Sequence, residues 1–123
     1  MSISNAAELS ILDAVFNATA YSVATPYVSL HTADANETGT DECTGGSYIR
    51  KLGSFDPAAD GATTTNAALT WTNMPACTVH SVGIWTAESS GTFVWGGNLT
   101  VEKTLNSGDT FQINSGDLDI TLD

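Results

Sequence analysis

The sequence predicts an all-β fold: a single β-sandwich or jelly-roll-like domain over residues 1–123, with one short N-terminal α-helix. Short runs of β-branched and aromatic residues recur along the chain, and clusters of Gly, Asn, Asp and Ser separate them. The strongest runs lie within 73–99, where two apolar segments flank the polar turn Ala87–Gly91 as in a β-hairpin. About seven or eight such strands are typical of a sandwich or jelly roll.

One helix is predicted at the N-terminus, over about residues 5–16. Ser4 or Asn5 can cap it, and Asn5 with Glu8 has the spacing of a capping box. Large apolar residues then recur on one helical face: Leu9, Leu12 and Phe16. This face predicts a helix that covers one end of the β domain or that contacts another subunit.

The rest of the chain is expected to be extended. Further strands are predicted at 27–32, 47–52, 67–72, 111–113 and 118–122, with loops at 33–46 and 55–65. An Asn-Ser-Gly-Asp motif begins at Asn106 and again at Asn114. Each copy suits a tight turn because Gly adopts positive φ and Asn or Asp bonds the local backbone. The two short strands that follow these turns predict a meander at the sheet edge.

The charge is strongly negative, with fourteen acidic residues against three basic ones and a net charge of −11. Such a surface repels phosphate backbones and anionic lipid, so neither nucleic acid nor a membrane is an expected partner. No apolar run approaches the roughly eighteen residues of a membrane helix. The N-terminus lacks the basic segment of a secretory signal, and export by that route is not expected.

The sequence predicts no enzyme and no catalytic residue. It has no Gly-x-Ser-x-Gly elbow and no Cys in a basic setting. The soft metal ligands are His31, His80, Cys43 and Cys77. Residues three apart on a strand point to opposite faces, so the Cys77–His80 segment does not predict a zinc site.

No cofactor is expected, and calcium is the one alternative. Oxygen ligands crowd two loops: Asp34, Asn36, Glu37, Asp41 and Glu42 in the first, and Asp109, Asp117 and Asp119 in the second. Neither loop has the spacing of an EF-hand, so the interpretation preferred is a solvated acidic surface. The sequence leaves open whether Cys43 and Cys77 form a disulfide.

Several motifs occur in a characteristic order: Tyr27–Asp34 (YVSLHTAD), Gly45–Tyr48 (GGSY), Asn73–Pro75 (NMP), Val82–Trp85 (VGIW) and Gly116–Leu122 (GDLDITL). In these motifs the chain resembles a family of small structural proteins of tailed-phage virions, commonly labelled tail-fibre-like. The resemblance covers about residues 9–123. It implies a non-enzymatic component of the virion and identifies no catalytic or ligand-binding residue.

Two roles are compatible with this resemblance. The one we predict is a capsid decoration, or cement, protein: a homotrimer on the outer capsid surface that binds the major capsid protein and stabilises capsomer junctions, assembled in the host cytoplasm. The sequence favours it because it has neither the heptads nor the long repeats of an extended fibre. The alternative is a tail or tail-fibre component that binds host-surface carbohydrate through loops 33–46 and 86–91. Subunit or capsid contacts are expected from exposed apolar and aromatic residues: Leu9, Leu12, Phe16, Tyr21 and Tyr48.

Overall fold

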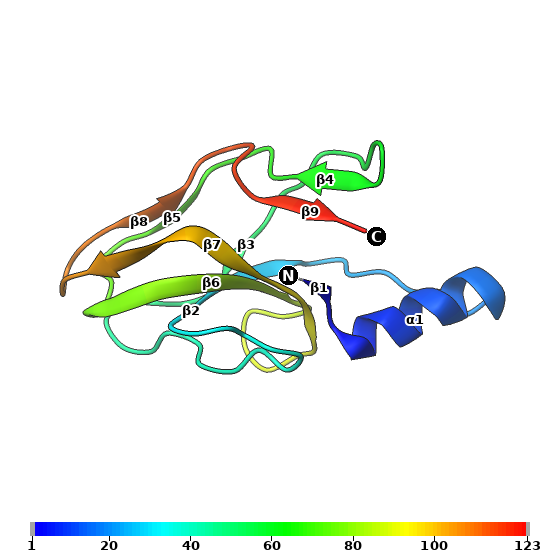
Figure 1. The fold of residues 1–123 in the computed structure, drawn as a ribbon, viewed down its shortest axis with the longest axis horizontal. Helices are drawn as coiled ribbons and strands as arrows, with labels where there is room; N and C mark the ends of the chain where they lie inside the picture. Colours follow the sequence, from blue (N-terminus) through cyan, green and yellow to red (C-terminus); the bar gives the residue numbers. More distant parts are fainter. Residues whose placement is uncertain (1, 123) are drawn as a thin grey trace.

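Three antiparallel sheets and one helix form the computed structural model, which describes residues 2–122 (Figure 1). In chain order the elements are β1 (Ser2–Ile3), α1 (Asn5–Phe16), β2 (Tyr27–His31), β3 (Lys51–Leu52), β4 (Ala62–Thr64), β5 (Leu69–Trp71), β6 (Cys77–Trp85), β7 (Phe93–Leu105), β8 (Phe111–Ile113) and β9 (Asp119–Thr121). The predicted all-β, sandwich-like architecture with one short N-terminal helix is confirmed.

The largest sheet has the strand order β1-β7-β6-β2-β3. Its centre is β6, in which Ile84 pairs with Val28 of β2 on one side and with Trp95 of β7 on the other. The pairs β5–β8 and β4–β9 form a second layer over one face of this sheet (Figure 1). The main core lies between the layers, and its residues are Val28, Leu30, Cys43, Leu69, Trp71, Met74, Val79, Val82, Ile84, Trp95, Leu105, Phe111, Ile113 and Leu118.

The predicted hairpin is confirmed, since β6 and β7 pair through the connection 86–92. Strand β7 continues to Leu105, beyond the apolar run that signalled it. Both Asn-Ser-Gly-Asp turns also form, with Gly108 and Gly116 at φ +92° and +84°.

Other boundaries differ from the prediction. Strand β3 keeps only the last two residues of 47–52, and β4 lies inside the segment expected to be a loop. The predicted meander is wrong, because β8 pairs with β5 and β9 pairs with β4. Pairing β8 with β5 puts Phe111 opposite Trp71 and Ile113 opposite Leu69, so four apolar side chains reach the core together.

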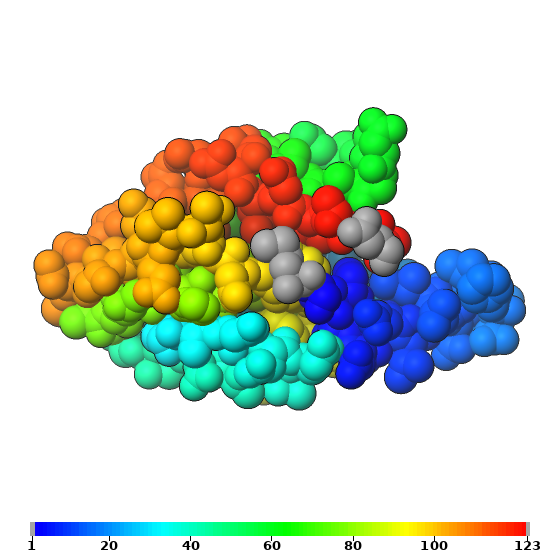
Figure 2. Space-filling view, viewed as in Figure 1, coloured from blue at the N-terminus to red at the C-terminus, as the bar shows by residue number. Residues whose placement is uncertain are grey.

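Helix α1 begins and ends where the sequence predicts. Ser4 is the N-cap: its hydroxyl accepts a hydrogen bond from the Ala7 backbone N–H at 3.2 Å and donates to the Phe93 carbonyl at 2.7 Å. The helix packs against β7 but projects beyond the β layers (Figures 1 and 2). Ala7 is its only fully buried residue.

Candidate functional site

The large sheet has a second face, opposite the main core, on which the polar side chains of Ser29, His31 and Ser81 are fully buried. Along β2, Val28 and Leu30 join the core, while Ser29 and His31 point to the other side, as strand alternation requires. Neither Ser29 nor His31 has any exposed surface. The connection 32–46 covers them, and Ser81 of β6 anchors that connection by donating from Oγ to the Ala33 carbonyl at 2.7 Å.

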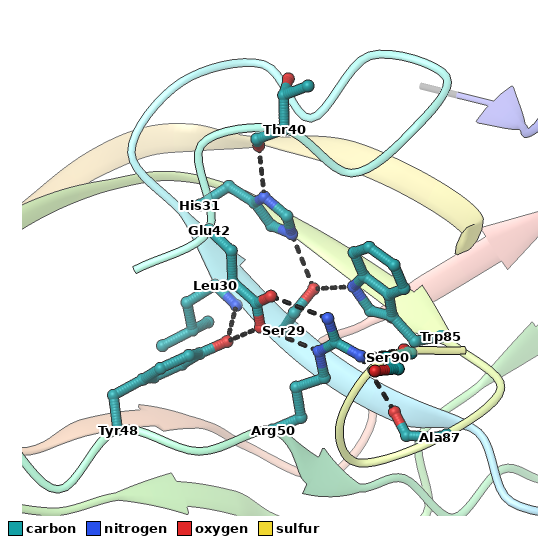
Figure 3. Close-up of polar contacts among 10 residues, drawn as sticks. All are labelled: Ser29, Leu30, His31, Thr40, Glu42, Tyr48, Arg50, Trp85, Ala87 and Ser90. Carbon is teal, nitrogen blue, oxygen red and sulfur yellow. Dashed lines mark hydrogen bonds and ion pairs between the residues drawn. The ribbon is translucent and has the colours of Figure 1, made fainter. Parts of the chain in front are cut away.

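The hydrogen bonds of His31 identify its tautomer. Nδ1 lies 2.7 Å from the Thr40 carbonyl, which can only accept, so Nδ1 carries the proton. Nε2 then accepts from the Ser29 hydroxyl at 2.7 Å, and that hydroxyl accepts from Trp85 Nε1 at 3.0 Å (Figure 3). Burial lowers the pKa of His31 below its ordinary 6.5, so the ring is neutral at pH 7.

The Ser29–His31 pair has the atoms of a serine-hydrolase dyad but not its surroundings. A nucleophilic hydroxyl must meet a substrate, and Ser29 is completely enclosed. The other ring nitrogen of His31 faces a backbone carbonyl, where a triad has a carboxylate. The pair therefore holds the loop on the sheet.

A second set of contacts centres on Arg50, the residue before β3. Its guanidinium binds Glu42 in a bidentate pair, with Nε–Oε2 and Nη2–Oε1 both at 2.9 Å (Figure 3). Tyr48 donates its hydroxyl to Glu42 Oε2 at 2.7 Å and accepts from the Leu30 N–H at 2.9 Å. A bidentate pair of this kind fixes both the position and the orientation of the two side chains.

Arg50 also holds the tip of the β6–β7 hairpin. Its Nη1 donates to the carbonyls of Ala87 at 3.1 Å and Ser90 at 2.8 Å. Its guanidinium carbon lies 3.7 Å from the centre of the Trp85 ring, a cation–π contact. One side chain thus joins both loops, 32–46 and 86–92, to the sheet. We call Ser29, His31, Glu42, Tyr48, Arg50 and Trp85 the polar network.

Burial and hydrogen bonds together decide which groups of the network are ionised. Burial alone would raise the pKa of Glu42, but the hydrogen bonds from Arg50 and Tyr48 outweigh it and lower that pKa below 4.5. Burial raises the pKa of Tyr48 far above its ordinary value, and the bond to Glu42 adds to the rise. Glu42 is therefore ionised and Tyr48 neutral at pH 7, as a donor-to-carboxylate bond requires.

A shallow cleft of about 380 Å³ opens beside the network. Its walls come from 42–45, 48–50 and the hairpin tip 88–90. Ile49, half exposed, contributes a large apolar surface, and the hydroxyls of Ser89 and Ser90 contribute polar ones. Both loops that the sequence associates with carbohydrate thus meet at one cleft.

The residues expected to make subunit or capsid contacts occupy two different places. Leu9, Leu12 and Phe16 are exposed on α1, and Tyr21 is exposed in the segment that follows it. Tyr48 instead lies half-buried in the polar network with its hydroxyl bonded on both sides. Its position differs from the exposed aromatic that the sequence suggested.

Helix α1 is apolar on two opposite sides. Ala7, Ser10, Ile11 and Ala14 form the inner side and are at least partly buried. Four large residues form the outward face, with 51–75% of each side chain exposed: Leu9, Leu12, Val15 and Phe16. At 100° per residue they fall within one third of the helix circumference. A groove of about 340 Å³ borders this face, lined by Ile11 and Leu12 of the helix and by Leu122 near the C-terminus.

Other candidate ligands of the sequence make hydrogen bonds within the chain. His80 bonds Glu102 across β6 and β7. Asp34 accepts from the Asn36 N–H, Glu37 from the Asn5 N–H, and Asp109 from the Asn106 N–H. Within residues 2–122 no three His, Cys, Asp or Glu side chains are grouped as ligands of a metal ion. Over the same residues, no helix is long and apolar enough to span a membrane.

Sequence reasoning missed the polar network as a unit. Arg50 and its two carbonyl partners are 37 and 40 residues apart, so no local pattern joins them. One signal was present: Arg50 is one of only three basic residues in a chain of net charge −11. A cation directly after an apolar residue, as Arg50 follows Ile49, indicates a carboxylate partner in a chain this acidic.

A protein-family model described as Podophage GP4 fiber I protein gp80 matches residues 2–121 of the chain. No curated protein sequence matches the chain.

Proposed function

Because the chain belongs to the family of the podophage GP4 fiber I protein gp80, we propose that it is a component of the phage fibre, attached through the outward face of α1. The family is one of phage virion structural proteins, which supports a structural role in the particle. The polar network serves this role by holding the loops 32–46 and 86–92 on the sheet through Arg50 and Glu42.

The outward face of α1 is the observation that carries the attachment. A helix that is apolar on both sides is normally buried, and here only the inner side is covered by the chain's own strands. Leu9, Leu12 and Phe16 have the i, i+3, i+7 spacing by which an amphipathic helix docks in a groove. Because the four residues of the outward face are 51–75% exposed, completing their burial would contribute about 1–2 kcal/mol each.

The chemistry of the partner follows from charge. The helix carries only Glu8 and Asp13 as charged residues, and the whole chain is at −11. Two copies approaching each other would bring together like charges, with no basic residue on α1 to compensate. The occupant that fits is another virion protein, with an apolar groove whose rim carries Lys or Arg.

Capsid decoration remains a second candidate. The β layers pack closely around one main core, and α1 is a single helix of 12 residues. A body of this kind suits a repeated site on a shell, where it would bind the major capsid protein. Copy number and place in the particle separate the two roles.

The test is to measure the copy number of the protein and its position in purified virions. Cryo-electron microscopy with a quantified protein gel should find few copies, all on the fibre. Many copies over the capsid shell would overturn the fibre assignment and establish decoration.

The attachment is tested with Leu9→Gln/Phe16→Gln, which keeps helix propensity and removes two apolar anchors. Particles assembled with this variant should lack the protein, whereas Val101→Gln, at an equally exposed residue of β7, should be incorporated normally. The isolated wild-type protein should sediment as a monomer. A trimer that the double variant dissolves would identify a second copy as the occupant.

A further inference from the structure

The two cysteines of the chain are adjacent in space although 34 residues separate them. Their sulfur atoms lie 3.7 Å apart. Cys43 lies in the connection 32–46, where its backbone N–H donates to the Leu30 carbonyl at 2.8 Å. Cys77 opens β6 and pairs with Leu105 of β7. Because backbone hydrogen bonds hold both residues, the tertiary fold itself brings the thiols together.

The distance suits a cross-link. A disulfide bond is ~2.0 Å long, so the sulfurs must approach by a further ~1.7 Å. That displacement is of the size that rotation about the two Cα–Cβ bonds provides. The strand pairing on either side can stay in place.

The two thiols differ in access. Cys43 is 3% exposed, whereas Cys77 is partly open to solvent. Burial raises the pKa of Cys43 to about 12, and the neighbouring Cys77 thiol adds to the rise. A reagent from solution therefore reaches Cys77 first, and Cys43 is protected from reaction with anything except Cys77.

We propose that Cys43 and Cys77 form an intramolecular disulfide when the protein leaves the reducing cytoplasm and meets a low-molecular-weight disulfide such as oxidised glutathione. The Cys77 thiolate attacks one sulfur of glutathione disulfide, forms a mixed disulfide and releases one glutathione thiol. Cys43 then loses its proton to water, and its sulfur attacks the Cys77 sulfur and displaces the second glutathione. Two protein thiols are oxidised and one small disulfide is reduced to two thiols.

The cross-link would stabilise the polar network in its folded arrangement. Cys43 directly follows Glu42, and Glu42 holds Arg50, which in turn holds the hairpin tip at Ala87 and Ser90. Tying residue 43 to β6 fixes the chain on one side of Glu42. The loops would then stay closed in a particle outside the host, after assembly with free thiols inside it.

The experiment compares the purified protein in dithiothreitol and in oxidised glutathione. After oxidation, intact mass spectrometry should show the loss of two hydrogens, and thiol titration should find no free thiol. The melting temperature should rise by about 10 °C. The bond joins residues 34 positions apart and so lowers the conformational entropy of the unfolded chain.

Two single variants separate the steps. Cys43→Ser should retain one bound glutathione on Cys77, because no thiol remains to displace it. Cys77→Ser should stay unmodified, because Cys43 is buried. Circular dichroism should show both variants folded. Wild-type protein that keeps a glutathione adduct, keeps two free thiols or forms a disulfide-linked dimer would overturn the proposal.

Discussion

The outward face of α1 and the polar network reverse the usual relation between polarity and burial. Leu9 and Phe16 are large and apolar, and they lie in solvent. Ser29 and His31 of the network are polar, and they have no exposed surface. The difference is in their partners: Ser29 and His31 are hydrogen-bonded within the chain, whereas more than half of each large apolar residue on the outward face of the helix lies open to solvent. One region is closed within the chain, and the other leaves an apolar face that the proposed partner would cover.

The largest loss of stability should come from removing Arg50, the cation of the network. Arg50→Met leaves Glu42 half-buried and unpaired and frees two loop carbonyls, so we expect a loss of about 3 kcal/mol in the free energy of unfolding. Urea denaturation measures it. Lys103→Met, an exposed cation of β7, is the control and should change stability by less than about 0.5 kcal/mol. Equal effects of the two variants would mean that Arg50 is only a surface charge.

Gly83→Ala tests how closely the network packs on the sheet. A Cβ atom at this position would lie 2.6 Å from the Phe93 ring, 2.7 Å from Ser29 Oγ and 2.9 Å from His31 Nε2. Relieving these overlaps should cost about 2 kcal/mol of folding free energy. Thermal and urea unfolding should agree, and the Trp85 fluorescence spectrum should shift. An unchanged melting temperature would show that this layer is loosely packed.

Acid should weaken the network in two stages. Because burial holds the pKa of His31 below 6.5, the unfolded chain binds more protons than the folded one once the pH falls below about 6.5, and stability declines. The pKa of Glu42 lies below 4.5 in the folded protein, so a further loss follows as the pH falls through 4.5.

Melting temperatures measured between pH 7.5 and 5.5 isolate the first stage. The charges that act on His31 are Glu42, Asp41 and Arg50, and they remain in the variant His31→Gln. That variant should be less stable at pH 7.5 and should show a flatter pH dependence. A slope equal to that of the wild type would assign the acid response to other groups.

The smallest effect on stability should come from the outward face of α1. Leu9→Gln/Phe16→Gln changes two side chains that contact solvent in the isolated protein, so its free energy of unfolding should stay within about 0.5 kcal/mol of the wild type. Differential scanning calorimetry measures this. A loss of several kcal/mol would mean that the helix face belongs to the protein's own core, and the contrast between the two regions would disappear.

Much of the fold follows from local patterns. The capping serine and the apolar spacing predicted α1 to the residue, and the β-branched runs predicted β2, β5, β8 and the β6–β7 hairpin. Strand β4 was missed because Ala62–Thr64 has no large apolar side chain. The meander failed because β8 pairs with β5, 40–44 positions earlier, and β9 pairs with β4, 55–59 positions earlier. Local alternation does not encode which strand pairs with which.

For the candidate surfaces too, one part follows from local sequence and the other from the tertiary structure. The sequence alone determined which apolar residues share one face of α1, because the periodicity of a helix is a property of consecutive residues. That this face is exposed comes from the structure. Only the tertiary structure decided the polar network and the meeting of Cys43 with Cys77. Hydrogen bonds and thiol contacts act over about 3–4 Å, and the folded sheet is what brings residues 34 to 40 positions apart within that range.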